Sequence, residues 1–374
     1  MMGIVNRQQS LRILGTRGIP AAHGGFETFA EYLALYLAQR GWQVTVYCQW
    51  DGEGAVYEDT WEGVRRVHIS ISQAGSLGTI LFDWKSTLHA ARERGLVLTL
   101  GYNTAVFCAL YRLKGVSNLI NMDGIEWRRA KWSRPVQAWF WINERFGCWF
   151  GNHLIADNPG IADHLATRVS RSKITMIPYG ADTITTADPE ILHRWGLQSG
   201  SFATLIARPE PENSILEAVA AFSRRPRGMK LLVLGKYDPG QAYHKRVLDA
   251  ASDEVVFAGA IYDKDIVKAL RFHSALYVHG HQVGGTNPSL VEALGAGNAV
   301  LAHGNPFNRW VAGSEARYFI NEDECAACFD GLLGDAAELA RMSQASRERH
   351  GTMFTWEKVL AEYEKLLVGW LGKV

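Results

Sequence analysis

Residues 279–303, HGHQVGGTNPSLVEALGAGNAVLAH, contain the pattern that decides the fold. Short apolar runs precede and end this segment, which indicates two buried strands joined by a glycine loop and a helix. Asn287 is a favourable N-cap residue, and Pro288 suits the first helical position because its missing N–H is not needed there. Gly297 can adopt the left-handed conformation on which helices often end. The segment therefore predicts a strand, a loop, a helix over 288–296 and a returning strand.

A loop of this kind is suited to binding an anion. Backbone N–H groups and the helix dipole favour negative charge at a helix N-terminus, and phosphate is the usual anion. Glu292, about one turn into the helix, would repel phosphate and is better suited to accept hydrogen bonds from sugar hydroxyls. The pattern thus favours a nucleotide diphosphate and its ribose, bound by Gly284, Gly285, Thr286, Asn287 and Glu292. An ordinary tight connection in an α/β domain is the alternative.

The sequence GGTNPSLVEALGAGNAVLA resembles the nucleotide-sugar loop of the retaining glycosyltransferases of family 4, which have the GT-B fold. In that family a Glu-x7-Glu signature spans the loop and its second Glu binds the ribose; Glu292 matches this position. The first Glu is replaced by Gly284, which removes a partner for the donor sugar and favours a 6-deoxy sugar. The GGTNPSL form resembles a subgroup that includes bacterial rhamnosyltransferases of surface polysaccharide synthesis.

Composition excludes several functional classes. The chain has 374 residues, a net charge of +1 and 47% apolar residues, which is typical of a globular protein without a field that attracts nucleic acid. The N-terminal MMGIVNRQQS has no apolar core of a signal peptide, and no apolar run is long enough to span a bilayer. We expect a cytoplasmic protein, with any membrane contact at the inner face of the cell membrane.

A second glycine motif lies near the N-terminus, in GTRGIPAAHGGFETFAEYLA, residues 15–34. It again follows a strand and precedes a helix, and it resembles the N-terminal signature of the same glycosyltransferase subgroup. The resemblance implies that Gly24 and Gly25 approach the donor diphosphate and that Arg17 and Glu27 contact the acceptor. A surface ion pair between Arg17 and Glu27 is the alternative.

A charged loop follows the predicted strand 118–122, in the sequence NMDGIEWRRAKW. Carboxyl ends of parallel strands are where α/β sheets place ligands. Asp123 stands where many family 4 members have His and is suited to orient the acceptor hydroxyl or take its proton. Arg128, Arg129 and Lys131 are suited to bind an acceptor phosphate, and Glu126 is assigned to the same loop. A solvated turn without a ligand is the alternative.

The aromatic segment 133–150, SRPVQAWFWINERFGCWF, predicts a helix with few charges. Aromatic rings beside basic residues suit a helix seated at a membrane interface. Packing into the domain core or into a dimer contact explains the same pattern. The membrane interpretation fits a lipid-linked acceptor.

The second half begins with an apolar strand near 201–207 that ends in Arg208. The family motif has an Arg and a nearby Lys that bind the donor phosphates; Arg208 matches the Arg, and Asn213 occupies the Lys position. By resemblance, the backbone at Ile261 meets the nucleotide base. Asp263 in the sequence DKD is expected to cap a helix rather than hold a metal, so no metal and no cofactor are expected.

Strand and helix patterns alternate along both halves, which predicts two doubly wound, Rossmann-like sheets. We expect GT-B architecture: an acceptor-binding domain over 1–185, a nucleotide-sugar domain over 186–353 facing it across a cleft, and a C-terminal helix over 354–374 that crosses back. The catalytic residues are expected to be Asp123, Arg208 and Glu292.

The predicted function is retaining transfer of a sugar such as rhamnose from a nucleotide-diphospho-sugar to a carbohydrate acceptor, which is either a glycan or a sugar linked to polyprenyl diphosphate. A sugar-nucleotide epimerase of the same architecture would use the same diphosphate site without an acceptor. A non-catalytic glycan-binding scaffold would need neither Arg208 nor Glu292.

Overall fold

The computed structural model describes residues 9–22 and 24–371. Residues 1–8 lie outside the described part, and with them most of the N-terminal segment that lacks the apolar core of a signal peptide. His23, in the N-terminal glycine motif, also lies outside it. The chain forms two compact units. The first comprises the chain up to Trp127, residues Trp132–Ile177 and the segment from Glu357 onward, and the second comprises Arg128–Lys131 and Pro178–Trp356.

The first unit is built on an eight-stranded sheet with the order β3-β4-β2-β1-β5-β6-β7-β8. All neighbouring strands are parallel except β3, which pairs antiparallel with β4 at the edge. The strands are β1 (Ser10–Leu14), β2 (Gln43–Asp51), β3 (Tyr57–Trp61), β4 (Val64–Ile71), β5 (Leu96–Leu100), β6 (Ser117–Asn121), β7 (His153–Ala156) and β8 (Ile174–Met176). Strand β3 is not predicted by the sequence, because YEDTW is mostly polar and pairs only at an edge.

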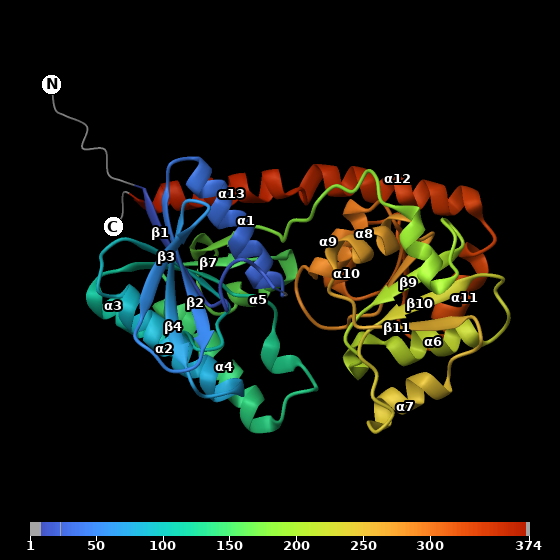
Figure 1. Ribbon diagram of the computed structural model, residues 1–374, viewed down its shortest axis with the longest axis horizontal. Helices are drawn as coiled ribbons and strands as arrows, with labels where there is room; N and C mark the ends of the chain where they lie inside the picture. The colour runs from blue at the N-terminus through green and yellow to red at the C-terminus, as the bar shows by residue number, and fades with distance from the viewer. Residues whose placement is uncertain (1–8, 23, 372–374) are drawn as a thin grey trace. The chain divides into compact units, whose positions relative to one another are not determined.

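Helices cover both faces of this sheet (Figure 1). In the view of Figure 1, α13 lies above the strands of this unit, and α2 and α4 lie below them. The helices are α1 (Gly25–Gln39), α2 (Gly75–Ala90), α3 (Ala109–Lys114), α4 (Arg134–Phe150), α5 (Pro159–Ala166) and α13 (Trp356–Leu371). Tyr363 of α13 packs on Phe29 of α1 and accepts a hydrogen bond from Asn121 of β6 at 2.8 Å, so α13 belongs to the core of this unit.

The chain changes direction between β1 and β5. Helix α1 links β1 to β2 on one side, and α2 carries the chain from β4 across to β5 on the other side. At this point Gly15, which follows β1, has a φ of +85°, and a Cβ there would lie 2.1 Å from the carbonyl oxygen of Leu100. Only glycine allows this close approach. Such a switch point is where α/β sheets form a ligand crevice.

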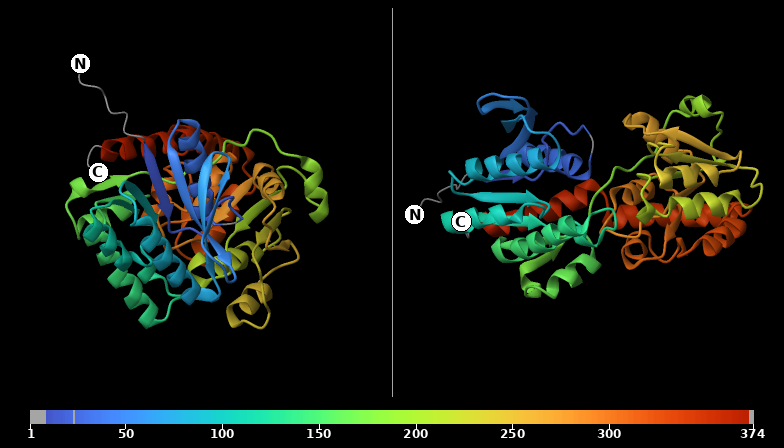
Figure 2. Two further views of the ribbon diagram at one scale, coloured as in Figure 1. Left: turned by 60° about the vertical axis from the view of Figure 1, so that its left-hand side comes forward. Right: turned by 90° about the horizontal axis from the view of Figure 1, so that it is seen from below.

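The second unit contains a six-stranded, fully parallel sheet with the order β11-β10-β9-β12-β13-β14. Its strands are β9 (Phe202–Ile206), β10 (Lys230–Leu234), β11 (Val255–Gly259), β12 (Leu276–His279), β13 (Ala299–His303) and β14 (Arg317–Phe319). Its helices are α6 (Ile215–Ser223), α7 (Ala242–Asp249), α8 (Lys264–Phe272), α9 (Pro288–Gly295), α10 (Pro306–Ala312), α11 (Glu322–Leu332) and α12 (Ala336–Met353). Figure 2 shows helices on both faces of this sheet as well. The switch point here lies between β9 and β12.

The deciding segment folds as its residues predict. Helix α9 begins at Pro288, and the Asn287 side chain accepts a hydrogen bond from the Ser289 N–H at 3.0 Å. The helix ends before Gly297, whose φ is +74°. Asp263 caps α8 by accepting from Asp265 and Ile266 N–H groups, which confirms its predicted capping role. The expectation of two doubly wound α/β sheets is confirmed.

The aromatic segment forms α4, which is amphipathic. Phe140, Asn143, Glu144, Gly147 and Cys148 are buried against the first unit. The opposite face exposes Trp141, Ile142 and Trp149, with side chains 41%, 43% and 57% exposed. The segment is therefore part core and part surface. Within the described residues, no helix combines the length and apolar character needed to cross a bilayer.

Candidate functional site

In the second unit, Arg208 lies just after the end of β9, at the switch point between β9 and β12. The residue is exposed, and none of the described side chains pairs with its guanidinium. Asn213 is buried, and its Nδ2 donates to the carbonyl oxygen of Arg208 at 2.9 Å. Asn213 thus supports the backbone that carries Arg208, while the Arg208 guanidinium is available to an anion.

Glu212 is a buried carboxylate that sequence patterns do not single out. Its Oε1 accepts from the Nε of Arg129 at 2.7 Å, and the Glu212 side chain is only 6% exposed. The segment Arg128–Lys131 accordingly groups with the second unit. The sequence favours Arg129 as a phosphate ligand, whereas in the structure its Nε is engaged by Glu212. The neighbouring residues Arg128 and Lys131 are exposed and partly exposed, respectively.

Two histidines lie at the end of β12, at the same switch point: His279 is its last residue, and His281 follows it. The rings of His279 and His281 stack with centroids 4.4 Å apart. Burial, together with the positive charges of Arg129 and Arg208, lowers the pKa of His281 to about 3. The ring of each histidine contains buried nitrogen atoms without a hydrogen-bond partner in the described residues: Nδ1 and Nε2 in His279, and Nδ1 in His281. His281 is therefore neutral near pH 7, so it does not repel a cation or attract a phosphate.

The glycine loop precedes α9. Gly284 has a φ of +144°, where a side chain is strained, and no atom lies within 4 Å of the place of a Cβ. A carboxylate at this position, as in the family signature, would need a different backbone conformation. Gly285 and Thr286 are buried beneath the loop, and Asn287 caps the helix. The predicted phosphate loop therefore leads directly into the capped N-terminus of α9.

Glu292 of α9 is fixed by an arginine from a neighbouring helix. The Nη2 of Arg271 in α8 lies 2.6 Å from the Glu292 Oε2 and donates to the Ser289 Oγ at 3.0 Å. The Tyr277 hydroxyl lies 2.6 Å from the same Ser289 oxygen. Arg271 is 7% exposed, whereas the Glu292 side chain is 36% exposed. The carboxylate is thus held by a buried partner and still reaches solvent.

Ile261 follows β11 at the same edge of the sheet. Its side chain packs against the apolar cluster that includes Leu234 and Leu270, which leaves the backbone at the surface of the cluster. The next residue, Tyr262, is 74% exposed. The structure thus brings Arg208, Asn213, the 284–287 loop and Glu292 into one unit, with Ile261 at the end of a nearby strand.

In the first unit, the N-terminal glycine motif leads into α1. Gly24 has a φ of +107°, and a Cβ there would lie 2.2 Å from the Glu27 Oε2. The Glu27 Oε1 accepts from the backbone N–H of Arg17 at 3.1 Å. Glu27 therefore ties the loop after β1 to the start of α1 at Gly25, and the bond is to the Arg17 backbone rather than to its guanidinium, which is exposed.

Asp123 lies just beyond β6, in the left-handed conformation with a φ of +52°. Its N–H donates to the Asn121 Oδ1 at 3.0 Å. The following residues are also held: the Glu126 N–H donates to the Tyr102 hydroxyl at 2.8 Å, and the Trp132 Nε1 lies 3.4 Å from the Glu126 Oε2. A non-glycine residue with positive φ is strained and is often found at a functional position.

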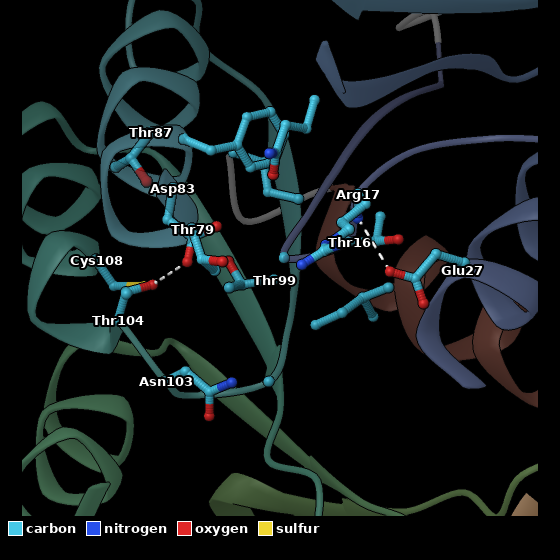
Figure 3. A pocket seen from close by; sticks show the side chains of 16 residues that line it. Thr16, Arg17, Glu27, Thr79, Asp83, Thr87, Thr99, Asn103, Thr104 and Cys108 are labelled. Atoms are coloured by element: carbon cyan, nitrogen blue, oxygen red, sulfur yellow. Dashed lines mark hydrogen bonds between the residues drawn. The ribbon is translucent and has the colours of Figure 1, made fainter. Parts of the chain in front are cut away.

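Figure 3 shows a pocket in the first unit that sequence patterns do not predict. Its volume is about 220 Å³, and it lies at the carboxyl ends of β1 and β5. Arg17 and Glu27 line it from one side, and Asp83 and Thr104 line it from the other (Figure 3). Asp83 comes from the middle of α2, where no motif or spacing distinguishes it from an ordinary surface residue.

Comparison with known proteins gives one family match and several structural matches. Residues 8–182 match a domain of unknown function, DUF1972. Among curated proteins, none matches the chain in sequence.

Solved structures match over nearly the whole chain. Sucrose-phosphate synthase from Thermosynechococcus elongatus has a TM-score of 0.79 at 18% identity, covering 98% of this chain and 100% of that chain. HepE of Anabaena, in complex with UDP and glucose, has a TM-score of 0.76 at 14% identity, covering 96% and 99%. A glycosyltransferase from Rickettsia africae has a TM-score of 0.69 at 14% identity, covering 97% and 98%. The expected GT-B fold is confirmed, while the likeness to rhamnosyltransferases finds no support in these structures.

Proposed function

We propose that this protein is a glycosyltransferase that uses a nucleotide-diphospho-sugar as donor. The observation that carries the proposal is the arrangement at the β9/β12 switch point of the second unit. There the Arg208 guanidinium, which pairs with none of the described side chains, follows β9, and a glycine loop at the N-terminus of α9 and a carboxylate fixed by Arg271 follow β12. The complex of HepE with UDP and glucose supports a donor of this class.

Each group has a role in the proposed reaction. Arg208 and the loop of Gly284, Gly285 and Thr286 bind the diphosphate and stabilise the charge that develops on it as the sugar leaves. Glu292 accepts hydrogen bonds from the ribose hydroxyls. The reaction retains configuration by front-face attack, in which the leaving diphosphate takes up the acceptor proton.

The acceptor belongs to the first unit and its adjoining loop. Asp123 orients the acceptor hydroxyl, and Arg17, Glu27 and Glu126 contact the acceptor sugar. Arg128 and Lys131 bind an acceptor phosphate as point charges and hydrogen-bond donors. The functional division into residues 1–185 for the acceptor, 186–353 for the donor and a helix from 354 stays a prediction.

The proposed donor sugar is a 6-deoxy sugar such as rhamnose. Gly284 offers no side chain to donor-sugar hydroxyls, and its positive φ disfavours any residue that would. A sugar with one hydroxyl fewer loses least by this absence. A donor panel tests the point: preferred turnover of UDP-glucose over dTDP-rhamnose would exclude the rhamnose assignment and leave the glycosyltransferase proposal in place.

The proposed acceptor is a carbohydrate on a polyprenyl-diphosphate lipid, reached at the inner face of the cell membrane. The exposed face of α4, with Trp141, Ile142 and Trp149, supports contact with lipid headgroups. Sedimentation with anionic vesicles tests this contact. Binding by the wild type and its loss in the Trp141→Ala/Trp149→Ala double variant is expected, and equal binding by both would exclude α4 as the contact.

The direct test of activity is ³¹P NMR of dTDP-rhamnose or UDP-glucose with the protein, with and without a synthetic polyprenyl-diphosphate-linked monosaccharide. Release of nucleoside diphosphate that depends on the acceptor is expected. Conversion of the donor without acceptor would indicate the epimerase alternative. Absence of turnover by the wild type, together with unchanged binding of the acceptor glycan in Arg208→Ala, would indicate a scaffold.

A further inference from the structure

The pocket of the first unit contains a carboxyl group in an unusual setting. Asp83 lies in the interior of α2. Asp is unfavourable at such a position because its side chain competes for backbone hydrogen bonds. The Thr104 hydroxyl donates to its Oδ2 at 2.8 Å. Its Oδ1 has no hydrogen-bond partner among the described residues, and no described cation pairs with it. Burial raises the pKa of Asp83 to about 6.

A purely structural role does not account for this carboxyl. One oxygen suffices to accept from Thr104, and an asparagine amide would do so without burying a charge. The Asp83 side chain is partly accessible because it faces the pocket rather than the outer surface (Figure 3). The unused oxygen is therefore directed at space that a ligand can occupy.

The lining of the pocket specifies the ligand chemistry. Five threonines, Thr16, Thr79, Thr87, Thr99 and Thr104, contribute hydroxyls or polar surface, and Gln49 and Asn103 contribute amides. Apolar lining comes mainly from Leu14, Phe82 and Leu100. Hydroxyl and amide groups beside two carboxylates, Asp83 and Glu27, complement a neutral polyol, which donates several hydrogen bonds. An anion is disfavoured, because Asp83 is ionised above its pKa and the only cation in the lining, Arg17, is on the other side (Figure 3).

Size and position agree with this chemistry. The volume of about 220 Å³ is below the range of pockets for drug-sized ligands and suits a single ring. The pocket lies at the β1/β5 switch point, where a doubly wound sheet forms its ligand crevice. Glu27, which also lines the pocket, is held by the Arg17 backbone.

We propose that this pocket binds one sugar ring of the acceptor and that the Asp83 carboxylate selects it by accepting hydrogen bonds from two of its hydroxyls. This inference rests on the proposed glycosyltransferase function, since it names where an acceptor sugar is recognised. Asp83 is a specificity-determining residue in this account, and Thr104 keeps its carboxylate in position.

Saturation-transfer NMR tests the proposal with the methyl α-glycosides of glucose, mannose, galactose and rhamnose at millimolar concentration. The wild type is expected to bind at least one of them, and Asp83→Asn is expected to weaken that binding at least fivefold. Thr79→Phe, which fills the pocket from α2, is expected to abolish it. Asp163→Asn, an exposed carboxylate of α5 in the same unit, serves as the matched control and is expected to bind as the wild type does.

Nucleotide binding is measured on the same samples, so the two proposals fail separately. No glycoside binding by the wild type, or unchanged binding in both Asp83→Asn and Thr79→Phe, would overturn the pocket assignment even where UDP or dTDP binds. Loss of nucleotide binding in the wild type would instead count against the glycosyltransferase proposal. Glycoside binding that is lost in both variants and kept in Asp163→Asn supports the pocket.

Discussion

At the scale of single residues, Glu292 depends on Arg271. The two side chains form a 2.6 Å ion pair in which Arg271 is buried and Glu292 reaches solvent. Without Arg271 the carboxylate can rotate, and it no longer has the fixed orientation that the proposed contact with the ribose requires. Arg271 is therefore a positioning residue that would not itself contact the nucleotide.

We predict that Arg271→Gln raises the Kd for the bound nucleotide about tenfold, which corresponds to about 1.4 kcal/mol. Isothermal titration calorimetry measures the change, and thermal melting verifies that the variant is folded. Lys268→Ala, an exposed cation of the same helix, is the control and should leave the Kd unchanged. Partial recovery of affinity in Arg271→Lys would mark a positioning role; an unchanged Kd in Arg271→Gln would refute it.

Ionisation of Asp83 makes the folded state less stable as the pH rises, whereas a carboxylate paired with a cation makes it more stable. Burial raises its pKa from 3.8 to about 6, so ionised Asp83 destabilises the folded state above pH 6. As the pH falls from 6 toward 4, the folded protein takes up the proton first, and the cost disappears. The shift corresponds to at most about 3 kcal/mol.

Asp83→Asn should therefore raise the free energy of unfolding at pH 8 by up to about 3 kcal/mol, and the gain should vanish below pH 4. Urea unfolding of both proteins at the two pH values measures the difference. A gain that is the same at both values, or a loss at pH 8, would show that the charge of Asp83 is not the cause.

The residues that sequence analysis identifies share one property: they lie in a motif whose local structure is readable. Arg208 and Asp123 each lie just beyond the end of a strand, and Glu292 follows a glycine loop. Arg271 and Asp83 lie within helices, and their partners are 21 residues away. Their roles depend on the packing of one helix against another helix or a loop, which no local pattern encodes.

At the scale of elements, the N-terminus of α9 combines a helix cap with the predicted phosphate loop. Asn287 accepts from the Ser289 N–H, and Asp263 caps α8 in a comparable way. Removing an N-cap side chain costs about 1 kcal/mol of stability. Only the α9 cap adjoins the residues assigned to the diphosphate.

Asn287→Ala and Asp263→Ala should both lower the free energy of unfolding by about 1 kcal/mol. Nucleotide binding should weaken only in Asn287→Ala, because the loop that precedes α9 loses its anchor. Denaturant unfolding and calorimetry give the two quantities. Equal affinities in the two variants would show that the α9 terminus does not bind the nucleotide.

Most elements could be predicted because their apolar periodicity or caps are strong. The strand β3 could not, since Tyr57–Trp61 exposes most of its side chains at the sheet edge. Helix α4 was open to three interpretations because its aromatic residues lie all around the helix. The structure shows why: one face is buried on the first unit and the other exposes tryptophans.

At the scale of the whole molecule, two sheets with separate switch points divide the proposed chemistry. The edge at β9 and β12 carries the groups that we propose for a nucleotide, and the edge at β1 and β5 carries the pocket that we propose for a sugar ring. The repetition of a glycine loop before a helix in each half predicts this architecture. The packing of α13 on α1 and β6 also makes the first unit discontinuous in sequence.

The central claim is that the second unit binds a nucleoside diphosphate through Arg208. Thermal unfolding with UDP, dTDP, GDP and ADP tests it most directly, with Arg208→Ala and the surface control Lys245→Ala measured alongside. A ligand at 100 times its Kd stabilises by about 2.7 kcal/mol. We predict that UDP or dTDP stabilises the wild type and Lys245→Ala by about this amount and that Arg208→Ala loses the effect. Stabilisation by none of the four, or equal stabilisation of Arg208→Ala, would contradict the account.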